Sequence, residues 1–204
     1  MLHCERLQRS KIRQLSMLRA NSFNVSGKVS ILGRLRRPCH GRESSMSTTI
    51  RAAVLGDEAL LVVLNGFVHE LHVANRPEYF KPTRAEHVSA WFRSILQKSA
   101  GLIWIAEEDG VPVGYVLALL HEREENPFRS ARRWCEIDQI AVDDKWRRRG
   151  IARMLVQRAL TEIRRHGIRE VEMSSWSFNE AAHHAFRRLG FAPQIIRFGL
   201  TLPE

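Results

Sequence analysis

The sequence predicts an α/β domain in which a mixed, mostly antiparallel central sheet has helices on both faces. Two observations predict this class. Apolar residues repeat with the period of helices in some stretches and with the period of strands in others, and the elements follow the order β-α-α-β-β-β-α-β-α-β. Consecutive strands come first and strand–helix–strand units follow, which combines antiparallel hairpins with crossover connections.

The first half of this order contains a hairpin after two helices. Apolar residues at 60, 63, 64, 67, 68 and 71 line one helical face. Thr83-x-x-Glu86 reads as a capping box that opens the second helix, and Asp109-Gly110 reads as a hairpin turn. The expected elements are a strand at 48–53, a helix over 60–71, a helix from 83 to 101, and strands at 102–107 and 111–120.

The second half alternates strands and helices. A charged loop at 121–130 precedes it, and Ser177-x-x-Glu180 reads as a second capping box. Glycines at 167 and 190 are typical helix stops. The expected elements are a strand at 134–142, a helix over 150–166, a strand at 170–174, a helix from 177 to 190, and a last strand at 195–202.

Composition and charge divide the 204-residue chain near residue 45. Residues 1–45 hold ten basic and two acidic residues, whereas residues 46–204 hold 22 and 20. We therefore expect a basic, disordered extension at 1–45 and a folded domain at 46–204. The extension resembles a mitochondrial presequence, and an Arg/Ser-rich translated leader before a start at Met46 explains it equally well. Because the domain is nearly neutral, the sequence disfavours a nucleic-acid-binding function.

The cysteines and the apolar runs exclude further classes. Cys4, Cys39 and Cys135 are odd in number, widely spaced and without a CxxC pair, which disfavours a disulfide framework and a zinc site. We expect a reducing, cytoplasmic compartment and no metal. No apolar run reaches the length of a membrane span.

A basic, glycine-containing loop follows the strand that ends at Val142. The loop contains Arg147-Arg148-Arg149-Gly150, and a helix begins near Gly150. The amides at a helix N-terminus lack internal partners and favour a phosphate or pyrophosphate. An exposed basic face, or a patch for nucleic-acid phosphates, remains an alternative. Neither the Walker A pattern nor the dinucleotide GxGxxG pattern occurs.

Three motifs together resemble the GNAT family, the Gcn5-related N-acetyltransferases. Arg147-x-x-Gly150-x-Ala152 resembles the family's acetyl-CoA motif, residues 136–142 resemble its fourth strand, and residues 179–191 resemble its C-terminal motif. The resemblance covers roughly residues 48–202 and implies an N-acyltransferase with acetyl-CoA as cosubstrate and an amine as acceptor. A homodimer is compatible with it, and no membrane partner is expected.

The resemblance also implies a set of acetyl-CoA contacts. In the family, pantetheine enters the gap where the fourth strand splays from the next one, helped by a bulge. The resemblance implies that the backbone of Ile140, Ala141 and Val142 binds pantetheine. It implies that the pyrophosphate is held by the amides of Arg148, Arg149, Gly150, Ile151 and Ala152. Arg147 of the same motif, and Asn179 and Phe186 of the C-terminal motif, complete the implied cofactor-binding residues.

Two carboxylates are the catalytic candidates. Glu136 and Asp138 alternate along the strand and share one face, and by resemblance Glu136 takes the place of a general base. Alternatively, either carboxylate pairs with Arg132 or Arg133.

Phe186 departs from the family pattern, which often has a tyrosine there as the acid for the leaving sulfur. Water, Ser174 or Ser175 replaces that acid, or no acid is used, or the protein binds acyl-CoA as a sensor without turnover.

The remaining polar and aromatic residues receive plainer interpretations. His183-His184 lacks the spacing of a metal pair, and Cys135 alternates into the core. We expect the tryptophans to pack against the sheet: Trp104, Trp134 and Trp176. Residues 70–81 and 121–130 are the expected acceptor regions, and Glu122, Glu124 and Glu125 favour a cationic acceptor such as a polyamine, an aminoglycoside-like amine or a peptide α-amine.

Overall fold

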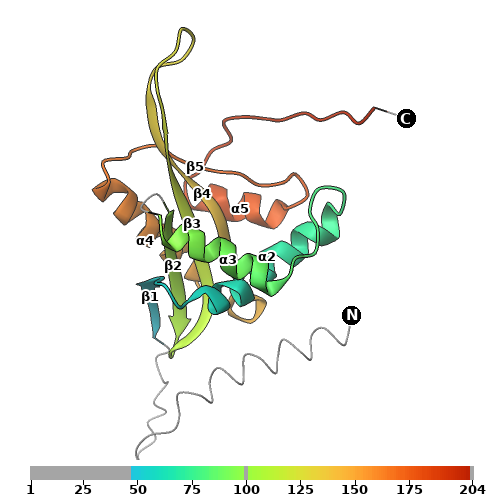
Figure 1. The fold of residues 1–204 in the computed structure, drawn as a ribbon, viewed down its shortest axis with the longest axis vertical. Helices are drawn as coiled ribbons and strands as arrows, with labels where there is room; N and C mark the ends of the chain where they lie inside the picture. The colour runs from blue at the N-terminus through green and yellow to red at the C-terminus, as the bar shows by residue number, and fades with distance from the viewer. Residues whose placement is uncertain (1–46, 99–100, 203–204) are drawn as a thin grey trace, which may run out of the picture. The chain divides into compact units, whose positions relative to one another are not determined.

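The computed structural model describes residues 47–98 and 101–202, so the predicted N-terminal extension lies outside the described residues. Five strands form one sheet in the order β1-β2-β3-β4-β5 (Figure 1). Strands β1 to β4 are antiparallel neighbours, and β5 runs parallel to β4. The elements are β1 (Thr48–Ala52), α2 (Glu58–Asn75), α3 (Ala85–Leu96), β2 (Gly101–Glu108), β3 (Val111–Arg123), β4 (Arg132–Val142), the 3-10 turn η1 (Asp144–Trp146), α4 (Ile151–Arg165), β5 (Val171–Met173) and α5 (Glu180–Arg188).

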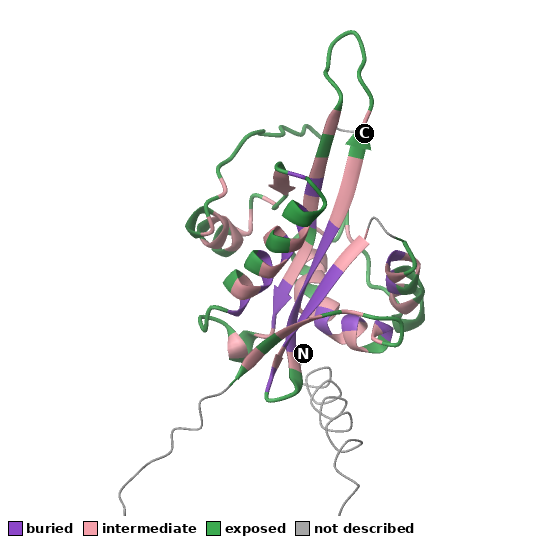
Figure 2. Cartoon of the chain, turned by 90° about the vertical axis from the view of Figure 1, so that its left-hand side faces the viewer, coloured by how far each residue is buried: buried purple, intermediate pink, exposed green. Residues whose placement is uncertain are grey.

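Helices cover both faces of the sheet, as the sequence predicts. The buried residues concentrate where the helices meet the strands (Figure 2). On one face α2 and α3 pack on the sheet, with a buried cluster of Leu61, Leu64, Phe92, Ile95, Ile103, Ile105, Tyr115, Leu117 and Ala141. On the other face α4 packs on strands β1 to β4, with Ile151, Leu155, Val156, Ala159 and Ile163 buried on the helix side. Burial of these side chains is the main stabilising contribution to the fold.

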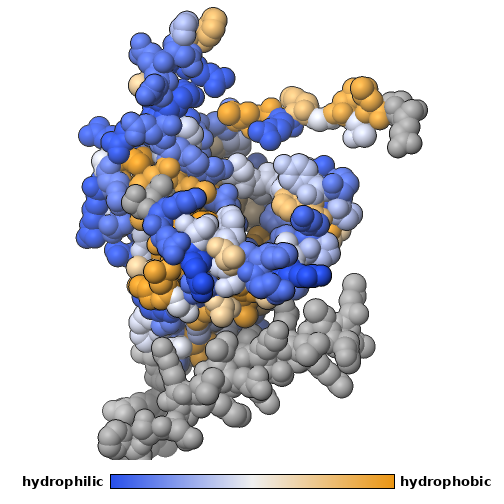
Figure 3. All heavy atoms as spheres, viewed as in Figure 1, coloured by the Kyte–Doolittle hydropathy of each residue, from blue (hydrophilic) through white to orange (hydrophobic). Residues whose placement is uncertain are grey.

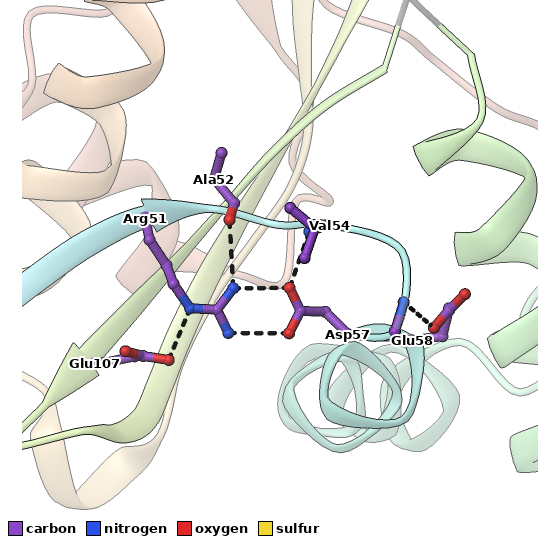
Figure 4. A network of polar contacts seen from close by, with 7 residues as sticks. Arg51, Ala52, Val54, Asp57, Glu58 and Glu107 are labelled. Carbon is purple, nitrogen blue, oxygen red and sulfur yellow. Dashed lines mark hydrogen bonds and ion pairs between the residues drawn. The ribbon is translucent and has the colours of Figure 1, made fainter.

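An arginine joins the sheet to the start of α2. The Arg51 guanidinium on β1 donates to both carboxylate oxygens of Asp57, at 2.7 and 2.9 Å, and to Glu107 on β2 at 2.9 Å (Figure 4). Asp57 also accepts the amide of Val54 at 2.9 Å. These bonds raise the pKa of Arg51 above its usual range. A bidentate pair of this kind fixes direction as well as distance, so it sets where α2 leaves the sheet.

Two helix starts differ from the predicted capping boxes. The N-cap of α3 is Arg84 in extended conformation, without a side-chain cap hydrogen bond, and Thr83 lies outside the helix. At α5 the cap is Asn179, whose Oδ1 accepts the amide of Ala182 at 3.1 Å, in place of the predicted Ser177. An Asn is as good an N-cap as a Ser, so the pattern alone does not separate positions two residues apart.

The hairpin between β3 and β4 is longer than predicted. The expected loop at 121–130 gives way to paired strands as far as Arg123 and Arg132. The tip is closed by a bridge between Asn126 and Arg129, and the hairpin projects from the domain (Figure 1). Charged residues are compatible with an exposed two-stranded ribbon, whose backbone bonds do not depend on a buried face.

The predicted last strand at 195–202 is wrong. This segment forms no regular structure, and its apolar side chains lie in solvent (Figures 1 and 3). The exposed residues alternate or follow one another along the segment: Ile195, Ile196, Phe198, Leu200 and Leu202. An alternating apolar pattern forms a strand only beside another strand, and in the described residues none pairs with this segment.

Candidate functional site

Strands β4 and β5 touch over a short stretch and then separate. Only Cys135, Glu136 and Ile137 of β4 pair with β5, opposite Val171, Glu172 and Met173. Beyond Ile137, β4 continues to Val142 with β3 on one side, and among the described residues no strand pairs with its other side. This uncovered stretch contains the predicted pantetheine-binding residues Ile140, Ala141 and Val142. An uncovered strand edge offers backbone donors and acceptors to an extended ligand.

A β-bulge lies where the two strands separate. Leu117 of β3 faces Gln139, but Ala118 faces Ile137, so Asp138 is the extra residue. The bulge reverses the alternation of β4. Ile137 and Ile140 both pack on the α4 side although three residues apart, and Ala141 packs on the α2 side. Bulges of this kind re-aim side chains next to functional sites.

Three side chains hold the strand next to the bulge. The Tyr115 hydroxyl donates to Gln139 Oε1 at 2.5 Å. The Asn65 amide nitrogen, from α2, donates to Tyr115 Oη at 3.0 Å and to Gln139 Oε1 at 3.1 Å. Tyr115 is fully buried, and this burial raises its pKa far above 10, so its hydroxyl stays a donor at neutral pH. The network ties α2, β3 and β4 together at the bulge.

The two candidate carboxylates lie on either side of the point of separation. Glu136 pairs in register with Glu172 of β5 and Leu119 of β3, and its side chain is about one-third exposed. Its Oε2 lies 3.4 Å from Nε2 of His121. The alternative pairing with arginines is not what the structure shows: Arg132 binds Glu170 and Glu172, and Arg133 lies nearest Glu122, at 3.9 Å.

The pKa of Asp138 is raised, first by desolvation and then by the negative charge of Glu136. A hydrogen bond with the Gln139 side chain and the charge of His121 oppose this rise. Asp138 itself keeps contact with solvent. Two carboxylates in different surroundings, one on each side of the point where β4 and β5 separate, are a pattern that general acid–base chemistry uses.

The loop after β4 forms a strained, basic turn at the start of α4. Arg148 and Gly150 both have positive φ, +67° and +85°. Gly150 is the N-cap of α4, and a Cβ there would meet nothing within 4 Å, so the space beside it is open. Arg147 donates to the carbonyl of Val142 at 3.3 Å and pairs with Asp144, and the Arg149 guanidinium lies 4.6 Å from the centre of the Trp146 ring.

The first turn of α4 carries no acidic residue. The amides of Ile151, Ala152 and Arg153 precede the first intrahelical bond, which runs from Met154 to Gly150. The Ile151 side chain is buried and the Ala152 side chain is half-buried, both toward the core. The geometry suits an anion above the helix start, and the individual pyrophosphate contacts stay predictions.

The C-terminal candidates differ in how they are placed. Asn179 Oδ1 accepts one cap hydrogen bond from α5, and the amide nitrogen of the same side chain is a donor for the predicted pantetheine contact. Phe186 is half-buried on α5, and its closeness to a sulfur stays a prediction. The sequence predicts that Trp176 packs against the sheet, but the structure places it elsewhere. It contacts Tyr79 and Phe80 of the α2–α3 connection at ring-centre distances of 4.9 and 5.6 Å.

The buried thiol of Cys135 fits its predicted role in the core. Burial raises its pKa to about 12, which removes it as a nucleophile at neutral pH. The residues that the sequence analysis did not single out are Asn65, Tyr115, Gln139 and His121. Their roles depend on the register of β3 and β4, which is set by a hairpin longer than predicted and by the bulge at Asp138.

The comparison with family models agrees with this geometry. The model described as "Acetyltransferase (GNAT) family" matches residues 67–191, more than half of the chain. The chain therefore belongs to the GNAT acetyltransferase family.

Curated relatives are similar over parts of their length. Mycothiol acetyltransferase of Cellulomonas flavigena is 32% identical over 124 residues, 58% of this chain and 34% of that protein. N-acetyltransferase 8 of Homo sapiens is 28% identical over 135 residues, 65% of this chain and 58% of that protein. N-acetylaspartate synthetase of Rattus norvegicus is 34% identical over 88 residues, 43% of this chain and 27% of that protein. The chain thus spans less than two thirds of the length of these relatives.

Solved structures share the fold. A mutant protein from Bacillus halodurans superposes with a TM-score of 0.71 at 24% identity, covering 76% of this chain and 99% of that one. An aminoglycoside N-acetyltransferase in complex with CoA gives 0.63 at 20% identity, covering 77% and 96%. A Clostridium acetobutylicum acetyltransferase with acetyl-CoA gives 0.59 at 17% identity, covering 76% and 96%.

No metal-binding group of three or more His, Cys, Asp or Glu residues occurs among the residues that the structure describes. Within the same residues, no helix is long and apolar enough to cross a membrane.

Proposed function

We propose that this protein transfers an acetyl group from acetyl-CoA to a primary amine by direct attack in a ternary complex. One observation carries the proposal: the uncovered stretch of β4 lies between Glu136 and the α4 loop along a single strand. A base, a strand edge and an anion site thus follow one another in the order in which the amine, the pantetheine arm and the pyrophosphate would need them.

The backbone of the chain would hold the cosubstrate. Ile140, Ala141 and Val142 would bond the pantetheine amides through the uncovered edge of β4. The pyrophosphate would lie over the start of α4, where amides, a helix dipole and arginines favour negative charge. Acetyl-CoA and an amine acceptor also agree with the family to which the chain belongs.

Glu136 is the proposed general base. The amine nitrogen attacks the thioester carbonyl, a new C–N bond forms, and Glu136 receives a proton from the nitrogen. The carbonyl oxygen gains negative charge, for which a β4 amide near Ile140 is the proposed donor. The C–S bond then breaks, and the thiolate leaves readily because a thiol has a pKa of about 8.5. Asp138 would act as the second carboxylate of the site.

Phe186 supplies no proton to the departing sulfur. Water or one of the serines after β5, Ser174 or Ser175, takes that place in the proposal, or the thiolate leaves unprotonated. This same residue favours a second candidate function, an acyl-CoA-binding sensor without turnover. The sensor would bind acetyl-CoA at the same strand edge and release no thiol.

A thiol-release assay with the full chain separates the two functions. Acetyl-CoA is offered with a panel of one aminoglycoside, one polyamine, one amino acid and one peptide α-amine, because the similar proteins include an aminoglycoside N-acetyltransferase and N-acetylaspartate synthetase. Amine-dependent thiol release supports the enzyme. Acetyl-CoA binding by calorimetry without thiol release supports the sensor.

Glu136→Gln tests the base within this assay. We expect kcat/KM to fall by about two orders of magnitude at neutral pH while the Kd for acetyl-CoA is kept. Asp138→Asn is the matched control, since it removes the neighbouring charge and should cost less. Full activity of Glu136→Gln across the pH range would move the base to Asp138 or to a water chain.

A further inference from the structure

His121 lies beside the proposed base. It occupies β3 opposite Trp134 of β4, and the two rings stack at 5.0 Å with 17° between their planes. This stacking fixes the imidazole so that Nε2 lies 3.4 Å from Glu136 Oε2. The distance is long for a hydrogen bond, as is common for catalytic contacts before substrates bind.

The two ends of this ring meet different surroundings. Nε2 is buried and makes no hydrogen bond with any of the described residues, while the side chain as a whole is 34% exposed. A buried ring nitrogen that makes no hydrogen bond costs free energy, so one fixed 3.4 Å from a carboxylate calls for a functional reason. His121 also lines a groove of about 290 Å³ together with Trp91, Ile95 and Leu119.

Proton balance supplies such a reason. An amine that arrives as ammonium loses two protons when it becomes an amide. The departing sulfur takes up one of them, and the other must reach the solvent before the next turnover. Glu136 is only one-third exposed, and bound acetyl-CoA would cover part of the exposed surface. Imidazole is the side chain that takes up and releases a proton near neutral pH.

We infer that His121 acts through Glu136: its Nε2 takes the amine proton from Glu136 Oε2, and its Nδ1 releases a proton to the solvent. This inference rests on the proposed function. His121 is thus a positioning residue for the base, placed by Trp134, and the groove between α3 and β3 is the exit of the proton.

Charged groups face His121 from three elements. Glu136 and Asp138 lie on β4, and Glu172 of β5 lies next to Glu136 in register. Lys98 follows α3 and lines the same groove as His121. The ring therefore lies between the carboxylates of the site and the groove.

His121→Phe is the first test, because it keeps a flat ring to stack on Trp134 and removes both nitrogens. We expect kcat in dilute, non-nucleophilic buffer to fall about tenfold to a hundredfold, with the acetyl-CoA Kd and Tm unchanged. His121→Ala is the second variant. Added imidazole should raise its kcat in proportion to concentration, but leave the wild type and Glu136→Gln unchanged after subtraction of a blank without acceptor.

The outcomes separate the relay from simple packing and from the proposed function. The relay is overturned if His121→Phe has the kcat of the wild type at all pH values. It is also overturned if imidazole does not rescue a folded His121→Ala. Neither result contradicts the proposed acetyltransferase function. Loss of kcat with a matching loss of Tm in both variants shows a packing role and overturns the relay too. A wild type that releases no thiol with any amine removes the proposed function, and the relay with it.

Discussion

The part of the domain from β1 to α4 and the part from β5 onward are built very differently. Helix α4 buries five residues, whereas α5 buries none. Strand β5 has three half-buried residues, and the segment at 195–202 exposes its apolar side chains. A large shared core holds the first part. The second part adds only partly buried apolar residues to that core, among them Val171, Met173, Leu189 and Phe191, and pairs with β4 over three residues.

The candidate site lies where these two parts meet. The first part supplies Glu136, the bulge and the α4 loop, all positioned by buried neighbours. The second part contains the predicted contacts Asn179 and Phe186, at the start of and within a helix without buried residues. This difference teaches that acetyl-CoA affinity should depend on the first part, while the second part adjusts contacts around the thioester.

The largest expected effect concerns the proposed anion site at the start of α4, in the first part. Gly150→Glu should weaken acetyl-CoA binding by at least about a thousandfold, or about 4.1 kcal/mol, because a carboxylate would stand where the pyrophosphate is proposed. Calorimetry with CoA and far-UV circular dichroism measure affinity and fold together.

Gly150→Ala separates charge from backbone strain. Both variants force a non-glycine residue to φ +85°, and the space beside Gly150 admits a Cβ. We expect Gly150→Ala to keep measurable affinity. Equal loss in both variants would assign the effect to the backbone, and unchanged affinity in a folded Gly150→Glu would remove the pyrophosphate from this loop.

The sequence predicts the part from β1 to α4 better than the part from β5 onward. Periodic apolar faces predict α2, α3 and α4 because each face is buried against the sheet. The segment at 195–202 has an equally regular pattern but forms no strand. The pattern predicts which side chains would be buried, but a strand also needs a neighbouring strand to pair with.

The candidate site also contains residues that the sequence predicts and residues that it does not. Glu136 and the α4 loop lie within the sequence motifs that resemble the family, so their positions in those motifs predict them. His121, Tyr115 and Gln139 come together only through the register of β3 and the bulge at Asp138. One extra residue in a strand changes which side chains face each other, and nothing in the local composition marks that residue.

A pair of leucine substitutions tests the difference in packing. Leu155→Ala in α4 should lower the free energy of unfolding by about 2 to 5 kcal/mol, since this side chain is fully buried. Leu200→Ala, where the side chain is 86% exposed, should change it by less than about 0.5 kcal/mol. Urea denaturation measures both. A cost above about 1 kcal/mol for Leu200→Ala would show that the C-terminal segment is covered in solution.

Phe186→Tyr probes the second part at the site. If this residue lies near the leaving sulfur, the new hydroxyl should raise kcat by about tenfold at most, equal to about 1.4 kcal/mol of barrier, because a thiolate needs little help. If Phe186 only packs α5, the hydroxyl should lower Tm without a change in rate. A large rate loss in a variant of unchanged Tm would contradict the placement of Phe186 near the sulfur.

The smallest expected effect concerns Asp138, at the boundary of the two parts. Its pKa is raised in the folded protein by desolvation and by Glu136, so ionisation opposes folding. At neutral pH, ionised Asp138 therefore lowers the folding stability of the wild type. This loss disappears as the pH falls, first through the pKa of Asp138 in the folded protein and then through its unfolded pKa of about 3.9. Asp138→Asn should be the more stable protein at pH 7 and should lose that advantage below about pH 4. Thermal melts at both pH values measure the difference, with Glu122→Asn as a control that removes a carboxylate elsewhere, on the β3–β4 hairpin. If Asp138→Asn is less stable at pH 7 and equal at low pH, the carboxylate is held by attractive contacts instead, and the Gln139 hydrogen bond outweighs the charge of Glu136.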